Sequence, residues 1–135
     1  MHTMKRLIAS SILFLCISHA HSQFKLDFCA SVDKNGYCLF NNNRFILSPD
    51  STTQRIWLEV INPDGFKGLS KIKFKIYSFE KSGEEKYDNT VEQPVQPEWV
   101  SAWVPYLFKS AGKYEVKIYN DLDELMCSKS MEVLN

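Results

Sequence analysis

The pattern that most constrains the fold is an alternation of apolar and charged residues between Lys71 and Tyr77. Ile72, Phe74 and Ile76 occupy one phase of this segment, and lysines occupy the positions between them. Successive side chains of a β-strand point to opposite faces of its sheet, so the segment predicts a strand with one buried and one solvated face. The fold is therefore expected to be built from half-buried strands.

The same alternation recurs along most of the chain, and no stretch after residue 22 shows a convincing helical apolar stripe. The polar stretch Lys81–Pro97 is expected to be a long excursion with at most one edge strand. Pro105 lacks an N–H donor and marks an edge or bent strand. The pattern predicts an all-β fold of seven or eight strands, a two-sheet sandwich rather than a small barrel, because each strand has one apolar and one polar face. Further strands are expected at Gln23–Val32, Tyr37–Phe40, Arg44–Leu47, Arg55–Ile61, Glu98–Phe108, Lys113–Tyr119 and Met126–Leu134.

Residues 1–22 are typical of a secretory signal peptide and are expected to be absent from the folded domain. A basic start, Lys5 and Arg6, precedes an apolar run over residues 7–17. The run is too short to span a bilayer stably, which takes about 20 apolar residues. Small residues then favour cleavage after Ser22, with cleavage after Ala20 as the alternative. The mature domain is therefore expected to span residues 23–135.

Two alternatives concern this segment. Met4 can serve as the start, because Met4, Lys5 and Arg6 already make a complete basic region. Cys16 ends the apolar run as in a lipoprotein signal, but such signals place a small residue before the cysteine, where this chain has Leu15. A secreted or periplasmic location is expected, with lipid anchoring at Cys16 as the less favoured form.

Removal of the signal takes away two of the 16 basic side chains and none of the 16 acidic ones, which leaves 14 against 16. This balance is unlike that of nucleic-acid binders, which carry an excess of basic residues. The three histidines, His2, His19 and His21, all lie in the removed segment. The mature chain therefore lacks Ser-His-Asp and Cys-His arrangements and histidine-ligated zinc or copper sites. We expect no enzyme, no cofactor, no metal and no stable membrane span.

Three cysteines remain in the mature chain, and an oxidising compartment favours one bridge and one free thiol. Cys29 and Cys38 are nine positions apart around an Asn35-Gly36 turn, and short loops close at low entropic cost. The spacing predicts a Cys29–Cys38 disulfide. Cys127 is then a free, buried thiol that faces inward beside Ile118. A reduced, packed state of all three cysteines is the alternative.

The segment Phe108–Ile118 combines an aromatic residue, an Ala-Gly turn and an alternating Tyr-x-Val-x-Ile run. Over its whole length it resembles the next-to-last strand of bacterial immunoglobulin-like and PKD-type domains. The resemblance implies an immunoglobulin-like β-sandwich in which Tyr114 is the corner tyrosine, whose hydroxyl bonds to upstream backbone. Val116 stands where antibody domains place their second core cysteine, so their inter-sheet disulfide is absent. The resemblance implies a fold and not a function.

Trp57, Tyr77 and Tyr119 fall on the polar phase of their strands and are candidate binding residues. Exposed aromatic side chains can anchor a protein partner or stack on sugar rings, unless the Lys81–Pro97 excursion covers them. We therefore expect a non-catalytic binding or structural module of unknown partner, with a small carbohydrate-binding domain as the alternative. A hydrolase built on carboxylates alone is the least favoured function.

The remaining charged and aromatic groups have structural interpretations. Three lysines, Lys71, Lys73 and Lys75, are expected to pair across strands with residues such as Glu59 and Glu115, rather than to bind an anionic polymer. The acidic hairpin of Asp121, Asp123 and Glu124 offers too few oxygens for calcium, which takes about six to eight. Trp99 and Trp103, four positions apart, are expected in the core.

Overall fold

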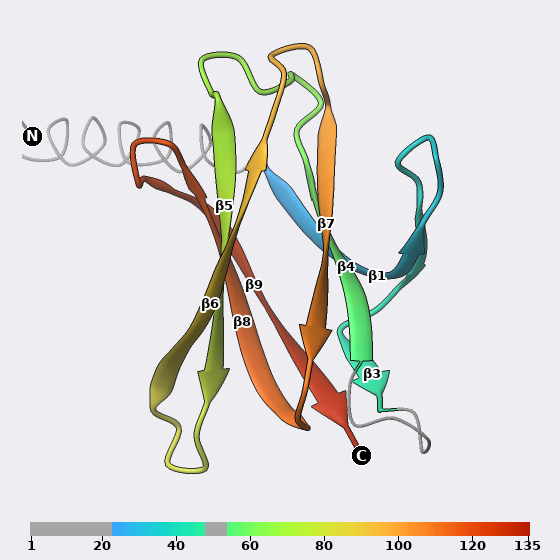
Figure 1. Cartoon of the computed structure of the whole chain (residues 1–135), viewed down its shortest axis with the longest axis vertical. Helices are drawn as coiled ribbons and strands as arrows, with labels where there is room; N and C mark the ends of the chain where they lie inside the picture. The colour runs from blue at the N-terminus through green and yellow to red at the C-terminus, as the bar shows by residue number, and fades with distance from the viewer. Residues whose placement is uncertain (1–22, 48–53) are drawn as a thin grey trace, which may run out of the picture.

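The computed structural model describes residues 23–47 and 54–135, and these form two β-sheets that pack face to face (Figure 1). The four-stranded sheet has the order β2-β1-β4-β7 and is called sheet A; the five-stranded sheet has the order β3-β9-β8-β5-β6 and is called sheet B. The prediction of an all-β, two-sheet sandwich is confirmed, although the described residues form nine strands and not the expected seven or eight. The strands are β1 (Lys25–Val32), β2 (Cys38–Asn41), β3 (Arg44–Ile46), β4 (Gln54–Ile61), β5 (Lys71–Phe79), β6 (Glu85–Pro94), β7 (Ser101–Phe108), β8 (Gly112–Asn120) and β9 (Leu125–Leu134).

The predicted signal peptide, including Cys16, lies outside the described residues, so cleavage and the start of the domain at residue 23 stay predictions. Among the residues that are described, no helix is long and apolar enough to cross a membrane.

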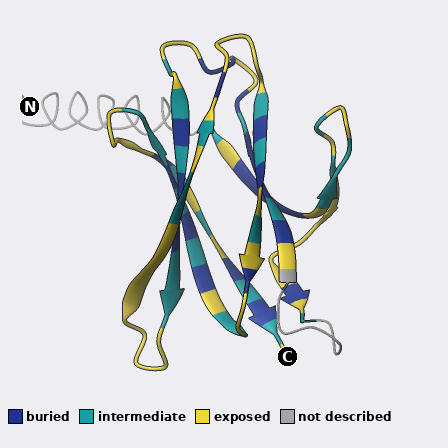
Figure 2. Ribbon diagram, in the orientation of Figure 1, coloured by how far each residue is buried: buried dark blue, intermediate teal, exposed yellow. Residues whose placement is uncertain are grey.

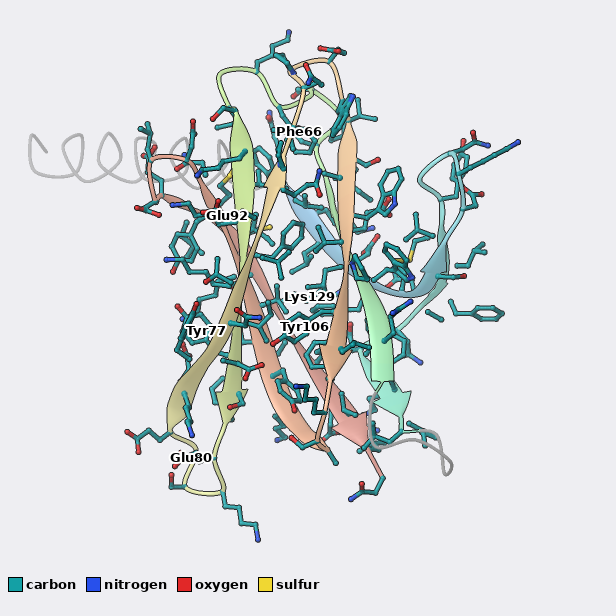
Figure 3. The ribbon with its side chains drawn as sticks, viewed as in Figure 1. Phe66, Tyr77, Glu80, Glu92, Tyr106 and Lys129 are labelled. Carbon is teal, nitrogen blue, oxygen red and sulfur yellow. A yellow bond between two sulfur atoms is a disulfide. The ribbon has the colours of Figure 1, made fainter. Side chains whose placement is uncertain are left out.

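The apolar phases of the strands meet between the two sheets and form the core. Buried positions alternate with partly exposed ones along the central strands, as Figure 2 shows. Phe66, from the connection between β4 and β5, is fully buried at one end of the sandwich (Figure 3). Burial of each such side chain stabilises the fold by about 1.5–3 kcal/mol. The central inward residues are Ile56, Leu58 and Val60 of β4 and Ile72, Phe74 and Ile76 of β5.

The two strands that the sequence marks as edges lie at sheet edges. β7, which contains Pro105, ends sheet A, and β6, within the polar stretch Lys81–Pro97, ends sheet B. The segment Asn41–Asn43 carries the chain from sheet A to sheet B. There the Asn42 side chain accepts hydrogen bonds from the amides of Asn43 and Arg44, and β3 then pairs in parallel with β9.

Tyr114 occupies the corner that the resemblance implies. Its hydroxyl donates to the carbonyl oxygen of Ser110 at 2.7 Å, and its ring packs edge-on against Phe108 with centroids 4.7 Å apart. The immunoglobulin-like corner is therefore present in this chain.

Replacing Tyr114 with Phe is expected to lower the free energy of unfolding by about 1–2 kcal/mol, because the ring packing stays while two part-buried hydrogen bonds to Ser110 are lost. Urea denaturation measures this, with Tyr87→Phe as the control, whose hydroxyl contacts Thr90 at the exposed edge. Equal losses in the two variants would show that the corner bond has no special role.

Candidate functional site

The three candidate binding residues lie on opposite outer faces of the sandwich. Trp57 belongs to β4 in sheet A, whereas Tyr77 and Tyr119 belong to β5 and β8 in sheet B. The structure therefore does not bring them together in one row. The Lys81–Pro97 stretch does not fold over Trp57 either, because it continues sheet B as β6 and places Tyr87 edge-on against Tyr77.

The outer face of sheet B is occupied by contacts within the protein. Lys75 and Lys117 each lie 4.5 Å from an aromatic ring centroid, of Tyr119 and Tyr77 respectively. The predicted cross-strand pairing of the lysines is confirmed in part: among the described residues Lys71 pairs with Glu92 of β6, whereas Lys73 pairs with Asp123 in the β8–β9 connection. The expected partners differ, since Glu59 lies in sheet A and Glu115 contacts Lys117. The ion pairs are Lys71–Glu92 at 3.2 Å, Lys73–Asp123 at 2.7 Å and Lys117–Glu85 at 2.8 Å. The hydrogen bond from Lys73 lowers the pKa of Asp123, as expected of a paired surface carboxylate.

The outer face of sheet A carries a different set of side chains. Cys29 and Trp57 are register partners, and in the next row Glu59 lies between Asp27 of β1 and Trp103 of β7. Directly paired residues point to the same side of a sheet, so these side chains are close neighbours. Two carboxylates, two indoles and a cysteine are thus gathered on one face.

The turn between β1 and β2 folds over this face. The Asp33 carboxylate accepts hydrogen bonds from the amides of Asn35 and Tyr37, which fixes the turn. Gly36 has a φ of +84°, and a Cβ atom built there would lie 2.8 Å from the Trp103 ring. The turn backbone therefore rests directly on the indole, which only a residue without a side chain permits.

A disulfide holds this hairpin to the sheet. Cys29 and Cys38 are bonded, as the spacing predicts, with their Cα atoms 5.5 Å apart. Cys127 is a free thiol and the register partner of Ile118, also as predicted, although it is partly rather than fully buried. Burial raises the pKa of its thiol to about 12, so it is a poor nucleophile.

Glu59 and Asp27 are buried although both point to the outer face. Glu59 is 1% exposed and Asp27 is 5% exposed. Within the described part of the chain, Oε2 of Glu59 and Oδ1 of Asp27 have no hydrogen-bond partner. Asp27 lies 3.9 Å from the ammonium groups of Lys25 and of Lys129, which belongs to β9 of the other sheet (Figure 3). The strand alternation alone would leave Glu59 solvated, and the hairpin removes it from water.

Burial raises the pKa of Glu59 to about 7, and the negative charges of Asp27 and Asp33 add to the effect. A carboxyl with this pKa exchanges its proton near neutral pH. The sequence contains no motif that marks it, because the cause is the tertiary placement of the β1–β2 turn.

A shallow pocket of about 580 Å³ adjoins this face, between the β1–β2 turn and the start of β7. The prediction that Trp99 and Trp103 lie in the core is wrong. β7 begins at Ser101, so Trp99 lies in the turn before the strand, with 41% of its surface exposed. Within β7 the Ala102 side chain points into the core, so that of Trp103 points outward. The pocket is lined by Lys34, Asn35, Gln93, Glu98, Trp99, Val100, Ser101, Ala102 and Trp103.

A second hollow, of about 550 Å³, lies where β6 approaches β7. Its central hydroxyl, that of Tyr106, donates to the Asp88 carboxylate across the gap between the two strands. Burial and this bond raise the pKa of Tyr106 far above its usual range, so the group acts as a link between the sheets.

No protein-family model matches the chain, and no curated protein sequence matches it. Among solved structures, the immunoglobulin-like protein PA1606 from Pseudomonas aeruginosa is similar over 81% of this chain and 91% of its own, with a TM-score of 0.53 and 11% identity. A superoxide reductase (neelaredoxin) from Ignicoccus hospitalis matches with a TM-score of 0.46 and 12% identity. The match covers 82% of this chain and 80% of the reductase chain. The similarity to PA1606 confirms the immunoglobulin-like fold and assigns no chemistry.

Proposed function

We propose that the chain is an exported, non-catalytic binding module that contacts its partner through the outer face of sheet A. The pocket of Trp99 and Trp103 is the observation that carries this proposal. Aromatic side chains in a hollow are the typical anchors of a binding surface. The signal-like segment over residues 1–22 and the Cys29–Cys38 bridge support an oxidising, extracytoplasmic location.

The contrast between the two outer faces supports the choice of sheet A. On sheet B the lysines and the aromatic rings Tyr77 and Tyr119 are engaged with one another. On sheet A, Trp99 and Val100 remain 41% and 52% exposed at the rim of a pocket. A ligand there buries apolar surface without breaking existing ion pairs.

A small carbohydrate-binding domain is the second candidate. The same pocket combines two indole rings with the amides of Asn35 and Gln93 and the carboxylate of Glu98. Sugar rings present apolar C–H faces and many hydroxyls, which such a set can stack on and hydrogen-bond. The Trp99–Trp103 pair therefore replaces the Trp57, Tyr77 and Tyr119 row as the site for this function.

Replacing Trp99 with Ala is expected to weaken binding by about 30-fold, corresponding to roughly 2 kcal/mol for an aromatic anchor. Screening the labelled protein on a glycan array, and against extracytoplasmic proteins of the producing cell, identifies which ligand class binds. Tyr119→Ala, on the opposite face, is the matched control and is expected to bind as tightly as the wild type. Binding that survives Trp99→Ala but not Tyr119→Ala would place the site on sheet B.

A further inference from the structure

We propose that the Cys29–Cys38 bridge is a reversible redox site, and that the Glu59 side chain is the proton donor and acceptor for its thiol–disulfide exchange with a dithiol. This proposal concerns the hairpin and its disulfide, and does not depend on which ligand the neighbouring pocket takes.

The geometry brings the three reacting groups together. The two sulfur atoms and one carboxyl oxygen of Glu59 all lie within 4.8 Å of one another. Such a separation allows proton transfer through one intervening water. Cys38 retains some exposure, whereas Cys29 has none. An external thiolate therefore reaches Cys38, and Cys29 becomes the leaving group beside the buried carboxyl.

The surroundings of Glu59 favour this role over a structural one. A structural carboxyl buried to this degree is normally hydrogen-bonded, yet Oε2 of Glu59 has no partner among the described residues. The charged groups around Glu59 are Asp27 on β1 and Asp33 in the turn. Asp27 is in turn paired with Lys25 and with Lys129 of β9. The neighbour of Glu59 on β7 is the uncharged Trp103. The two nearby aspartates and the burial keep Glu59 protonated up to neutral pH, where a donor is useful.

The exchange balances with a dithiol as reductant. One thiolate of the dithiol attacks Sγ of Cys38, and the electron pair of the S–S bond leaves on Sγ of Cys29. The Cys29 thiolate takes the proton of Glu59, which regains a proton from solvent. The second thiolate of the reductant then attacks its own mixed-disulfide sulfur and releases Cys38, which is protonated by solvent. Two protein thiols are formed, and the dithiol is oxidised to a disulfide.

Opening the bridge has a structural consequence. The disulfide ties the turn that covers Glu59 and contributes Lys34 and Asn35 to the pocket. Its reduction releases the hairpin from the outer face of sheet A, because two thiols no longer fix the ends of the turn.

The test is the rate of reduction by dithiothreitol between pH 5 and 9, expressed per mole of reagent thiolate and followed by alkylation and mass spectrometry. At pH 5.5 the wild type is expected to react about 10-fold faster than Glu59→Gln, because only the wild type carries a proton donor. Above pH 8, where Glu59 is ionised, the two rates per thiolate are expected to converge or reverse. Glu84→Gln, in an exposed turn, is the control and should follow the wild type.

Equal rates for the wild type and Glu59→Gln at pH 5.5 would overturn the proposal. If Glu59 only repelled the thiolate reagent through its negative charge, the two rates would differ at high pH alone. A second measurement needs no variant. In carboxyl ¹³C NMR of the wild type, the Glu59 signal should shift in a single pH step in the oxidised protein. After reduction it should shift in two steps, because the carboxyl then titrates together with a neighbouring thiol. An identical Glu59 titration in both states would equally contradict the proposal.

Discussion

When the pH is raised from 4.5 to 8, the wild type is expected to lose about 3 kcal/mol of stability relative to Glu59→Gln. The pKa of Glu59 is about 7 in the folded protein and near its ordinary value of 4.5 in the unfolded chain. Between these values the folded state holds a proton that the unfolded state has released, so wild-type stability falls as pH rises. A shift of this size corresponds to about 3 kcal/mol, and a glutamine side chain does not titrate.

Urea denaturation of the oxidised proteins at pH 4.5, 6 and 8 measures this difference. The gap between Glu59→Gln and the wild type should grow in favour of the variant up to about pH 7 and then stay constant. Glu84→Gln is the control, and its gap should stay small at every pH. A gap for Glu59→Gln that does not change with pH would show that the hairpin does not exclude water from this carboxyl.

The second large effect concerns the disulfide. The double replacement Cys29→Ala and Cys38→Ala is expected to cost about 3 kcal/mol, the value for a bridge that closes a short loop. The melting temperature should fall by roughly 10 °C or more. Because neither cysteine belongs to the core cluster of Phe28, Phe74 and their neighbours, the β-sandwich itself should survive, with its far-ultraviolet spectrum unchanged.

Limited proteolysis adds the location of the effect. Cleavage in the double variant should begin within residues 33–37, the turn that the bridge ties to sheet A. Cys127→Ala is the matched control, because it removes a partly buried thiol that forms no bridge. Equal losses of stability in the two variants, or cleavage spread over all loops, would show that the bridge does not hold the hairpin.

Local patterns were sufficient for most of the fold. The alternation at Lys71–Tyr77 predicts which face of β5 is buried, since that depends only on the period of the strand. The spacing of Cys29 and Cys38 predicts the bridge, because short loops close easily. The parallel pairing of β3 with β9 could not be predicted, because it joins residues almost ninety positions apart and has no local signal.

The candidate site depended on contacts that no local pattern records. Trp57 was expected to share a surface with Tyr77 and Tyr119, but phase within a strand does not say to which sheet that strand belongs. Glu59 was expected to pair with a lysine on an outer face, and is buried because a distant turn lies over it. Trp99 and Trp103 were assigned to the core by their spacing. The prolines at positions 94 and 97 could have indicated that Trp99 precedes the strand.

Site-specific photo-crosslinking in the producing cell shows whether the outer face of sheet A is the binding face, because the experiment works whatever the ligand is. A benzophenone side chain is placed either at Val100, on the rim of the sheet A pocket, or at Tyr119, on the outer face of sheet B. We expect a discrete adduct from position 100, weakened when Trp99 is also replaced by Ala, and none from position 119. Adducts from position 119 alone, or from neither position, would contradict this expectation.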